Sequence, residues 1–147
     1  MKKKNILLLF ILFIQFSNCF SQQLMETVND LQKIKDNQSQ FINKPLKDLL
    51  KEIKPPIKRV TGNPRKYNHE GMGYFVFNFE DNKQKDSLSL ENKIPATMVV
   101  YVNEYFDWDF HSRPKGKETI WTSEDALKYE NLTIVAFRIY GNGVTSK

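Results

Sequence analysis

Apolar residues recur at helical spacing twice near the start of the chain. The first set predicts an amphipathic helix over residues 24–36, and its members are Leu24, Val28, Leu31 and Ile34. The second set predicts a helix that ends before Pro55 and Pro56, and its members are Leu46, Leu49, Leu50 and Ile53. Asn43 or Lys44 is expected to cap this second helix. Pro45 then lies near its first helical position, where the missing proline N–H costs nothing.

Further along the chain, apolar and polar residues alternate, which predicts strands. Residues 73–80 are the clearest case, because one face would carry Phe75, Phe77 and Phe79 and the other would carry Tyr74, Val76 and Asn78. Three other runs complete a set of about four strands, and they cover residues 57–61, 96–110 and 132–140. The polar stretch 81–93 is expected to be a long exposed loop. Thr122 and Asp125 have the spacing of a capping box and predict a short helix over 123–129.

The order of these elements, helices first and then strands joined by turns and loops, defines the expected fold class. No regular alternation of strand and helix is present, so a parallel doubly wound sheet is not expected. The prediction is an α+β domain in which one or two N-terminal helices pack on a mainly antiparallel sheet of about four strands. No internal repeat or flexible linker divides the chain, so residues 22–147 are expected to form a single domain.

The first 21 residues carry a different pattern. Three lysines precede an unbroken apolar run over residues 6–14, and a short stretch with small residues at the cleavage positions follows. This is the arrangement of a secretory signal peptide. Small residues at Cys19 and Ser21 predict cleavage after Ser21, so that the mature chain begins at Gln22. As an alternative, Cys19 is the lipidated residue of an outer-membrane lipoprotein. In either case the protein is expected to be exported, and without lipidation it is periplasmic or secreted.

The formal charge of +5 falls once this segment is removed. Residues 1–21 contain three lysines and no acidic residue, so 19 basic and 17 acidic residues remain and the net charge becomes +2. The whole chain has 18 lysines and 4 arginines, whereas arginine is the usual reader of base edges, so nucleic acid is not an expected partner. Cys19 is the single cysteine, and a disulfide scaffold or a cysteine-based zinc site is therefore not expected in the mature domain.

One segment contains residue types that catalysis uses. If residues 107–111 are extended, Asp107, Asp109 and His111 share one face, and such groups bind divalent ions or transfer protons. His69 and Glu70 lie in a loop that could approach this face. The alternative is that the acids are only the solvated side of an edge strand whose other side is aromatic. No cofactor motif is present and no metal site is assigned, and the non-catalytic interpretation is preferred.

Four residues near this segment are candidates for a binding surface. Trp108, Trp121 and Tyr105 have the aromatic side chains that line binding grooves. Arg113 belongs to a basic stretch that suits an acidic partner or a carboxylate ligand. The alternative for each is an ordinary structural role, with the aromatic residues in the core and the charge in solvent.

Residues 41–50 read Phe-Ile-Asn-Lys-Pro-Leu-Lys-Asp-Leu-Leu. They resemble the helix start F-x-G-K-x-hydrophobic-x-x-L-L of many small exported bacterial proteins. These include outer-membrane-assembly lipoproteins of the SmpA/BamE type and beta-lactamase-inhibitor-like domains. Asn43 stands where those families have glycine. The resemblance implies that such helices are paired with an antiparallel sheet and that the protein acts by binding other proteins.

The sequence thus predicts an exported, non-catalytic domain that binds another protein or an envelope component, with inhibitor and immunity proteins as one named class. The binding surface is expected on the sheet face or on residues 80–95. Two alternatives stay open. One is a small metal-dependent or acid–base hydrolase that uses Asp107, Asp109 and His111, and the other is a structural surface lipoprotein anchored at Cys19. The pattern leaves the specific partner and the oligomeric state open.

Overall fold

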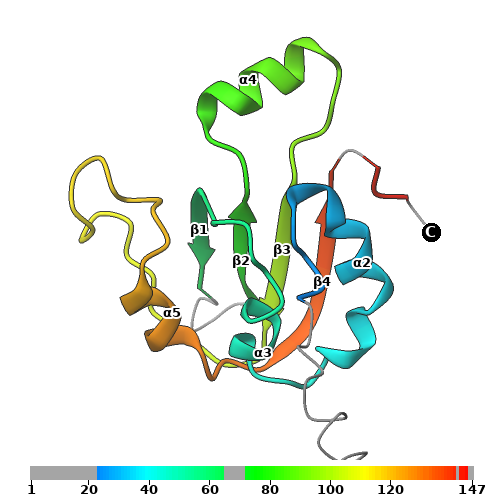
Figure 1. Ribbon diagram of the computed structural model, residues 1–147. Coiled ribbons are helices and arrows are strands. Elements are labelled where there is room, and N and C mark those ends of the chain that lie inside the picture. Colours follow the sequence, from blue (N-terminus) through cyan, green and yellow to red (C-terminus); the bar gives the residue numbers. More distant parts are fainter. Residues whose placement is uncertain (1–22, 65–71, 142, 146–147) are drawn as a thin grey trace, which may run out of the picture.

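The computed structural model describes residues 23–64, 72–141 and 143–145 and has an α+β fold, as expected (Figure 1). Four strands form one antiparallel sheet in chain order, and they are β1 (Arg59–Asn63), β2 (Gly73–Asn78), β3 (Thr97–Val102) and β4 (Ile134–Tyr140). The predicted signal peptide with Cys19 and the loop with His69 and Glu70 lie outside the described residues. Within the described ranges, no helix is long and apolar enough to cross a membrane.

The first helical region is present but shorter than its apolar spacing predicts. Its pieces are the 3-10 turn η2 (Val28–Asp30), the helix α2 (Leu31–Asp36) and a second 3-10 turn, η3 (Gln38–Gln40). Residues 24–27 are not helical. Met25 instead accepts a backbone hydrogen bond from Lys54 and donates one to Glu52, both at 2.9 Å. Backbone pairing with a distant segment has therefore replaced the first helical turn that the sequence predicted.

The second predicted helix, α3, spans only Leu46–Leu50 and has Pro45 as its N-cap, not Asn43 or Lys44. The residues just before it pair with the sheet. The N–H of Asn43 donates to the carbonyl of Ile134 at 2.8 Å, and the N–H of Ile134 donates to the carbonyl of Lys44 at 2.9 Å. Asn43 has a φ of 62°, a left-handed conformation that glycine and asparagine adopt more readily than other residues.

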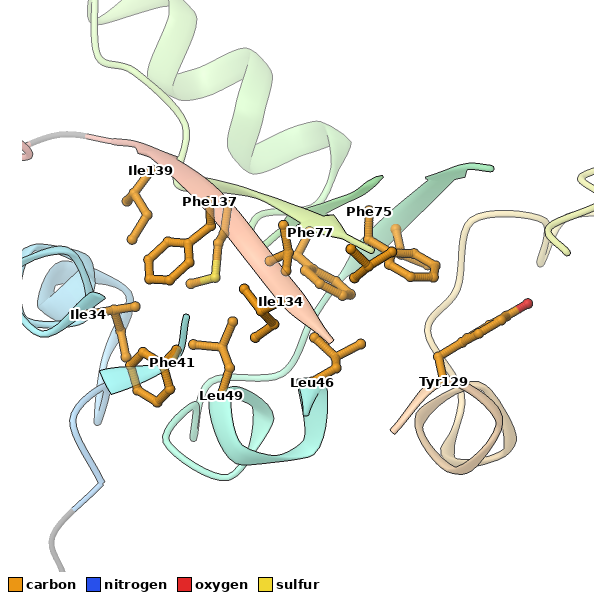
Figure 2. Packing of buried hydrophobic residues seen from close by; sticks show 14 of the residues in the cluster. Ile34, Phe41, Leu46, Leu49, Phe75, Phe77, Tyr129, Ile134, Phe137 and Ile139 are labelled. Carbon is orange, nitrogen blue, oxygen red and sulfur yellow. The ribbon is translucent and has the colours of Figure 1, made fainter. Parts of the chain in front are cut away.

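The strands β2 and β3 show the alternation of buried and more exposed residues that was predicted for residues 73–80, whereas in β4 two consecutive residues, Val135 and Ala136, are half-buried. Phe75 and Phe77 are fully buried, whereas Tyr74 and Val76 on the opposite face are half-buried. Figure 2 shows the covered face, where strand side chains such as Phe137 point toward the side chains of the helices below the sheet. The core thus lies between one sheet face and the helical layer, which leaves the other sheet face outside the core.

The stretch 81–93, expected to be a loop, contains the helix α4 (Asn82–Leu90). A capping box starts this helix, because the Asp81 carboxylate accepts the N–H of Gln84 at 2.9 Å and the Gln84 side chain accepts the N–H of Asp81 at 3.0 Å. The helix has no buried residue and projects beyond the end of the sheet (Figure 1). A helix that buries no face has no apolar stripe, so periodicity gave no signal for it.

The last helix, α5 (Ser123–Tyr129), has the predicted bounds and the predicted cap. Thr122 Oγ1 accepts the N–H of Asp125, and the Asp125 carboxylate accepts the N–H of Thr122 at 2.9 Å. Tyr129, its last residue, is buried against the sheet. The helix and residues 103–122 lie toward the β1 side of the sheet, whereas α2 lies toward the β4 side (Figure 1). A helix of only seven residues depends on this packing for its stability.

Candidate functional site

The long strand predicted over residues 96–110 ends at Val102, so its second half is not extended sheet. One backbone hydrogen bond continues past β3, from the N–H of Asn103 to the carbonyl of Thr133 at 3.0 Å, and the next contact to Thr133 comes from a side chain. The Glu104 carboxylate accepts hydrogen bonds from both the N–H and the hydroxyl of Thr133. Burial raises the pKa of Glu104, but these two hydrogen bonds lower it more, and the net pKa lies below its usual value. Beyond this point the chain leaves the sheet as an irregular segment over residues 103–122.

Asp107, Asp109 and His111 lie on this irregular segment, and all three are exposed. They do not share a strand face, because the strand on which that prediction depended is not formed. One carboxylate oxygen of Asp109 accepts the backbone N–H of His111 at 2.9 Å, so this acid stabilises a local turn. Within the described part of the chain, no group of three or more His, Cys, Asp or Glu side chains is placed to hold a metal ion.

Arg113, a candidate for binding an acidic partner, binds an acid of its own chain instead. Its guanidinium contacts both carboxylate oxygens of Asp125, at 2.9 and 2.7 Å, and donates to the carbonyl of Ile120 at 2.6 Å. The two side chains are only 15% and 9% exposed. Burial raises the pKa of Asp125, but the hydrogen bonds from Arg113 and from the N–H of Thr122 lower it more, which gives a net decrease. Arg113 therefore ties residues 103–122 to the start of α5.

Trp108 is buried and has a structural role in the same place. The guanidinium carbon of Arg113 lies 4.3 Å from the ring centroid of Trp108, which is cation–π distance. The ring also lies so close to Gly62 of β1 that a Cβ at Gly62 would be 2.4 Å from it. Phe75 meets Trp108 edge-on at 5.7 Å between centroids. Trp108 is thus part of the layer that covers β1 and β2.

The remaining two candidates, Trp121 and Tyr105, are more accessible. Trp121 packs edge-on against Phe77 at 5.1 Å between centroids and also lines a shallow pocket of about 300 Å³ between the end of α3 and α5. This pocket is lined largely by apolar side chains and has Lys54 as its charged lining residue. Tyr105 is 63% exposed at the start of the irregular segment. The four binding candidates therefore do not form one common surface.

The open face of the sheet is the surface that the structure brings together and that residue types alone did not single out. In the described part of the chain, no helix covers it, since the helical layer packs against the opposite face (Figure 1). Every side chain on this face is half-buried or exposed. By strand from β1 to β4 they are Arg59, Thr61, Asn63; Tyr74, Val76, Asn78; Thr97, Val99, Tyr101; Ala136, Arg138, Tyr140.

The centre of this open face is an aromatic and cationic cluster. The rings of Tyr74 and Tyr101 lie directly across β2 and β3, with centroids 5.5 Å apart. The guanidinium carbon of Arg138 lies 5.9 Å from the ring centroid of Tyr101. The hydroxyl of Tyr74 accepts a hydrogen bond from Asn63 at 2.8 Å. The open face contains two arginines and no acidic side chain, so it is complementary to a negatively charged surface.

The sequence indicated only part of the open face. Alternation within residues 73–80 identifies Tyr74 and Val76 as the side opposite the phenylalanines. What brings Tyr101 and Arg138 beside them is the register of three strands, which one strand's pattern does not contain.

No protein-family model, curated protein or solved structure matches this chain.

Proposed function

We propose that the chain after residue 21 is an exported, non-catalytic domain that binds another protein through the open face of its sheet. The observation that carries this proposal is the cluster of Tyr74, Tyr101 and Arg138 on an uncovered sheet face. Tyrosine and arginine are the residue types that dominate the binding energy of protein interfaces. The surrounding valines and threonines provide apolar area, and the two arginines favour a partner with an acidic surface.

The arrangement of helices and sheet supports the same function. The resemblance over residues 41–50 implies helices paired with an antiparallel sheet and a role in binding proteins, and the fold has that arrangement. The downstream strands follow no pattern of those families, but the departure within residues 41–50, Asn43 in place of glycine, has a physical explanation. Asn43 adopts a φ of 62°, and asparagine tolerates this conformation best among residues with a side chain.

Site-specific photo-crosslinking tests the proposed surface in cells that export the protein. A photoreactive amino acid is placed at Val99, at the centre of the open face, and in a matched control at Leu127, which is 70% exposed on α5. We expect a covalent adduct with one protein from the first position and none from the second. The Tyr101→Ala variant should then lower the affinity for this protein by about 2 kcal/mol, the loss typical of a central hot spot. An adduct that forms at Leu127 and not at Val99 would refute the proposal.

The proposed export has a separate test. The intact mass of the protein recovered from the envelope or the medium distinguishes a chain that begins at Gln22 from one that carries lipid on Cys19. We expect the mass of residues 22–147 without modification. A diacylated Cys19 would place the domain on a membrane surface instead, and recovery of the full-length chain would contradict export.

A further inference from the structure

The two outer edges of the sheet are protected to different extents. At β1, the N–H of Val60 donates to the carbonyl of Thr119, which lies on the irregular segment. At β4, the first residue, Ile134, bonds outward to the backbone of residues 43–44. Residues 136–140 of β4 have no such cover, because no backbone or side-chain hydrogen bond from the described residues reaches the outer side of this stretch. An uncovered edge is a template for another strand.

The outward groups of this free stretch can be assigned. Ile134 directs its N–H and carbonyl away from β3, toward residues 43–44. The register then shifts, since Val102 is opposite Ile134 and Tyr101 is opposite Ala136, so β4 has one extra residue. Because N–H and carbonyl directions alternate along a strand, this shift turns the groups of Phe137 and Ile139 outward. Both residues therefore present an N–H and a carbonyl to a new strand.

A groove of about 420 Å³ runs along this free edge. Residues 137–141, at the end of β4 and just after it, contribute five of its lining residues. Lys35 and Gln38 from the first helical region line it as well, and Ile94 and Val144 add apolar surface. The charged residues in this lining are Lys35 and Arg138, both cations, and Ile94 is 60% exposed. The groove is thus apolar, positively charged and open to the backbone edge.

We propose that this groove binds an extended segment of a partner protein, which adds as a fifth strand beside residues 136–140 of β4. Backbone hydrogen bonds to Phe137 and Ile139 align the segment, as in other cases of strand addition. An acidic side chain opposite Arg138 and apolar side chains on either side of it would match the cations and the apolar walls. The site adjoins the open face, with which it shares Arg138 and Tyr140, but its backbone hydrogen bonds at Phe137 and Ile139 do not depend on the function proposed for that face.

The positive charge of Arg138 favours an acidic segment of a partner protein over a second copy of this chain. An antiparallel pair of two β4 strands that covers the whole free stretch has its two-fold axis at Arg138. Arg138 would then face its own copy directly across the pair, and like charges in that position are unfavourable. A segment with an acidic residue at that position forms a favourable pair instead.

Peptide selection on the purified domain, residues 22–147, tests the proposal once circular dichroism has shown that the domain is folded. Phage-displayed random peptides are selected on the domain and the enriched sequences are synthesised. We expect the sequences to share an apolar–acidic–apolar alternation. In hydrogen-exchange NMR with such a peptide bound, the amides of Phe137 and Ile139 should become protected. A lack of enrichment, or protection confined to other residues, would overturn the proposal.

Charge variants separate this groove from the open face. Lys35→Glu should weaken peptide binding about fivefold, whereas the control variant Lys115→Glu, an exposed lysine on the irregular segment, should leave it unchanged. Thr61→Lys on the open face, on β1 at the opposite edge of the sheet from β4, should also leave it unchanged. Binding that falls with Thr61→Lys and not with Lys35→Glu would support the open face and reject the groove. A dimer in analytical ultracentrifugation that protects the same amides without peptide would assign the groove to a second copy.

Discussion

The contact between Trp108 and Gly62 makes a quantitative prediction about stability. In Gly62→Ala, the new Cβ would lie 2.4 to 2.9 Å from three atoms of Trp108, including its Cβ and the base of its ring. The ring has little room to move, because it is buried and also contacts the guanidinium of Arg113. Overpacking of this kind costs about 1–3 kcal/mol. Alanine recovers about 0.5–1 kcal/mol of backbone entropy relative to glycine, so a net loss of about 1–2 kcal/mol is expected.

A double-mutant cycle assigns this loss to the tryptophan. Trp108→Ala alone should cost about 3 kcal/mol or more, since a large buried ring is removed. In that background Gly62→Ala should be neutral or slightly stabilising, which gives a coupling energy of about 2 kcal/mol between the two sites. Urea unfolding followed by far-ultraviolet circular dichroism measures all four proteins without relying on tryptophan fluorescence. If Gly62→Ala costs the same with and without Trp108, the clash is not the cause and the reasoning fails.

Five other variants test three local features of the fold by urea unfolding and, for α4, by hydrogen exchange. Arg113→Met should cost about 2–3 kcal/mol near neutral pH, because it leaves the Asp125 carboxylate buried without its cation. The pKa of Asp125 is lowered in the folded state, so its contribution is present above the usual value of 3.8 and is lost as the pH falls below it. The difference in free energy of unfolding between the wild type and Asp125→Asn should therefore become smaller in acid. A difference that stays constant with pH would contradict this. Asp81→Ala should speed hydrogen exchange within α4 yet change global stability by less than about 0.5 kcal/mol, because α4 buries no residue. A large global loss would show that α4 is part of the cooperative unit. Asn43→Ala should cost about 1 kcal/mol and Asn43→Gly should not, and equal effects would argue against strain at φ 62°.

These features explain why the irregular segment 103–122 keeps one conformation without regular secondary structure. Its tryptophans pack on β1 and β2, and the side chain of Arg113 joins it to the first turn of α5 through Asp125. Tyr129 adds a hydrogen bond from its hydroxyl to the carbonyl of Asp107. Trp108, Trp121 and Arg113, which suggested a ligand site, therefore stabilise this segment. The surfaces that we propose for a partner are the open face and the β4 edge.

Local signals in the sequence were sufficient for several elements. The fold class, the alternation of 73–80 and the bounds of α5 follow from apolar spacing and one capping box. Each of these depends on residues within a few positions of one another, so a single sequence contains the information. The helix α4 was instead predicted to be a loop. Its cap at Asp81 and Gln84 is local too, but a helix without an apolar stripe resembles an exposed loop in a hydropathy pattern.

Contacts between distant segments decided where β3 ends and which side chains lie together on the surface. β3 ends at Val102, and just beyond it the carboxylate of Glu104 accepts the N–H of Thr133, 29 positions away in the sequence. The same is true of the proposed binding surfaces. Strand register alone places Tyr74, Tyr101 and Arg138 together, and the folding of residues 43–44 onto the start of β4 leaves only the rest of that edge free. The sequence by itself thus determined which residues are apolar, capped or alternating, whereas long-range backbone pairing determined which polar and aromatic side chains became neighbours.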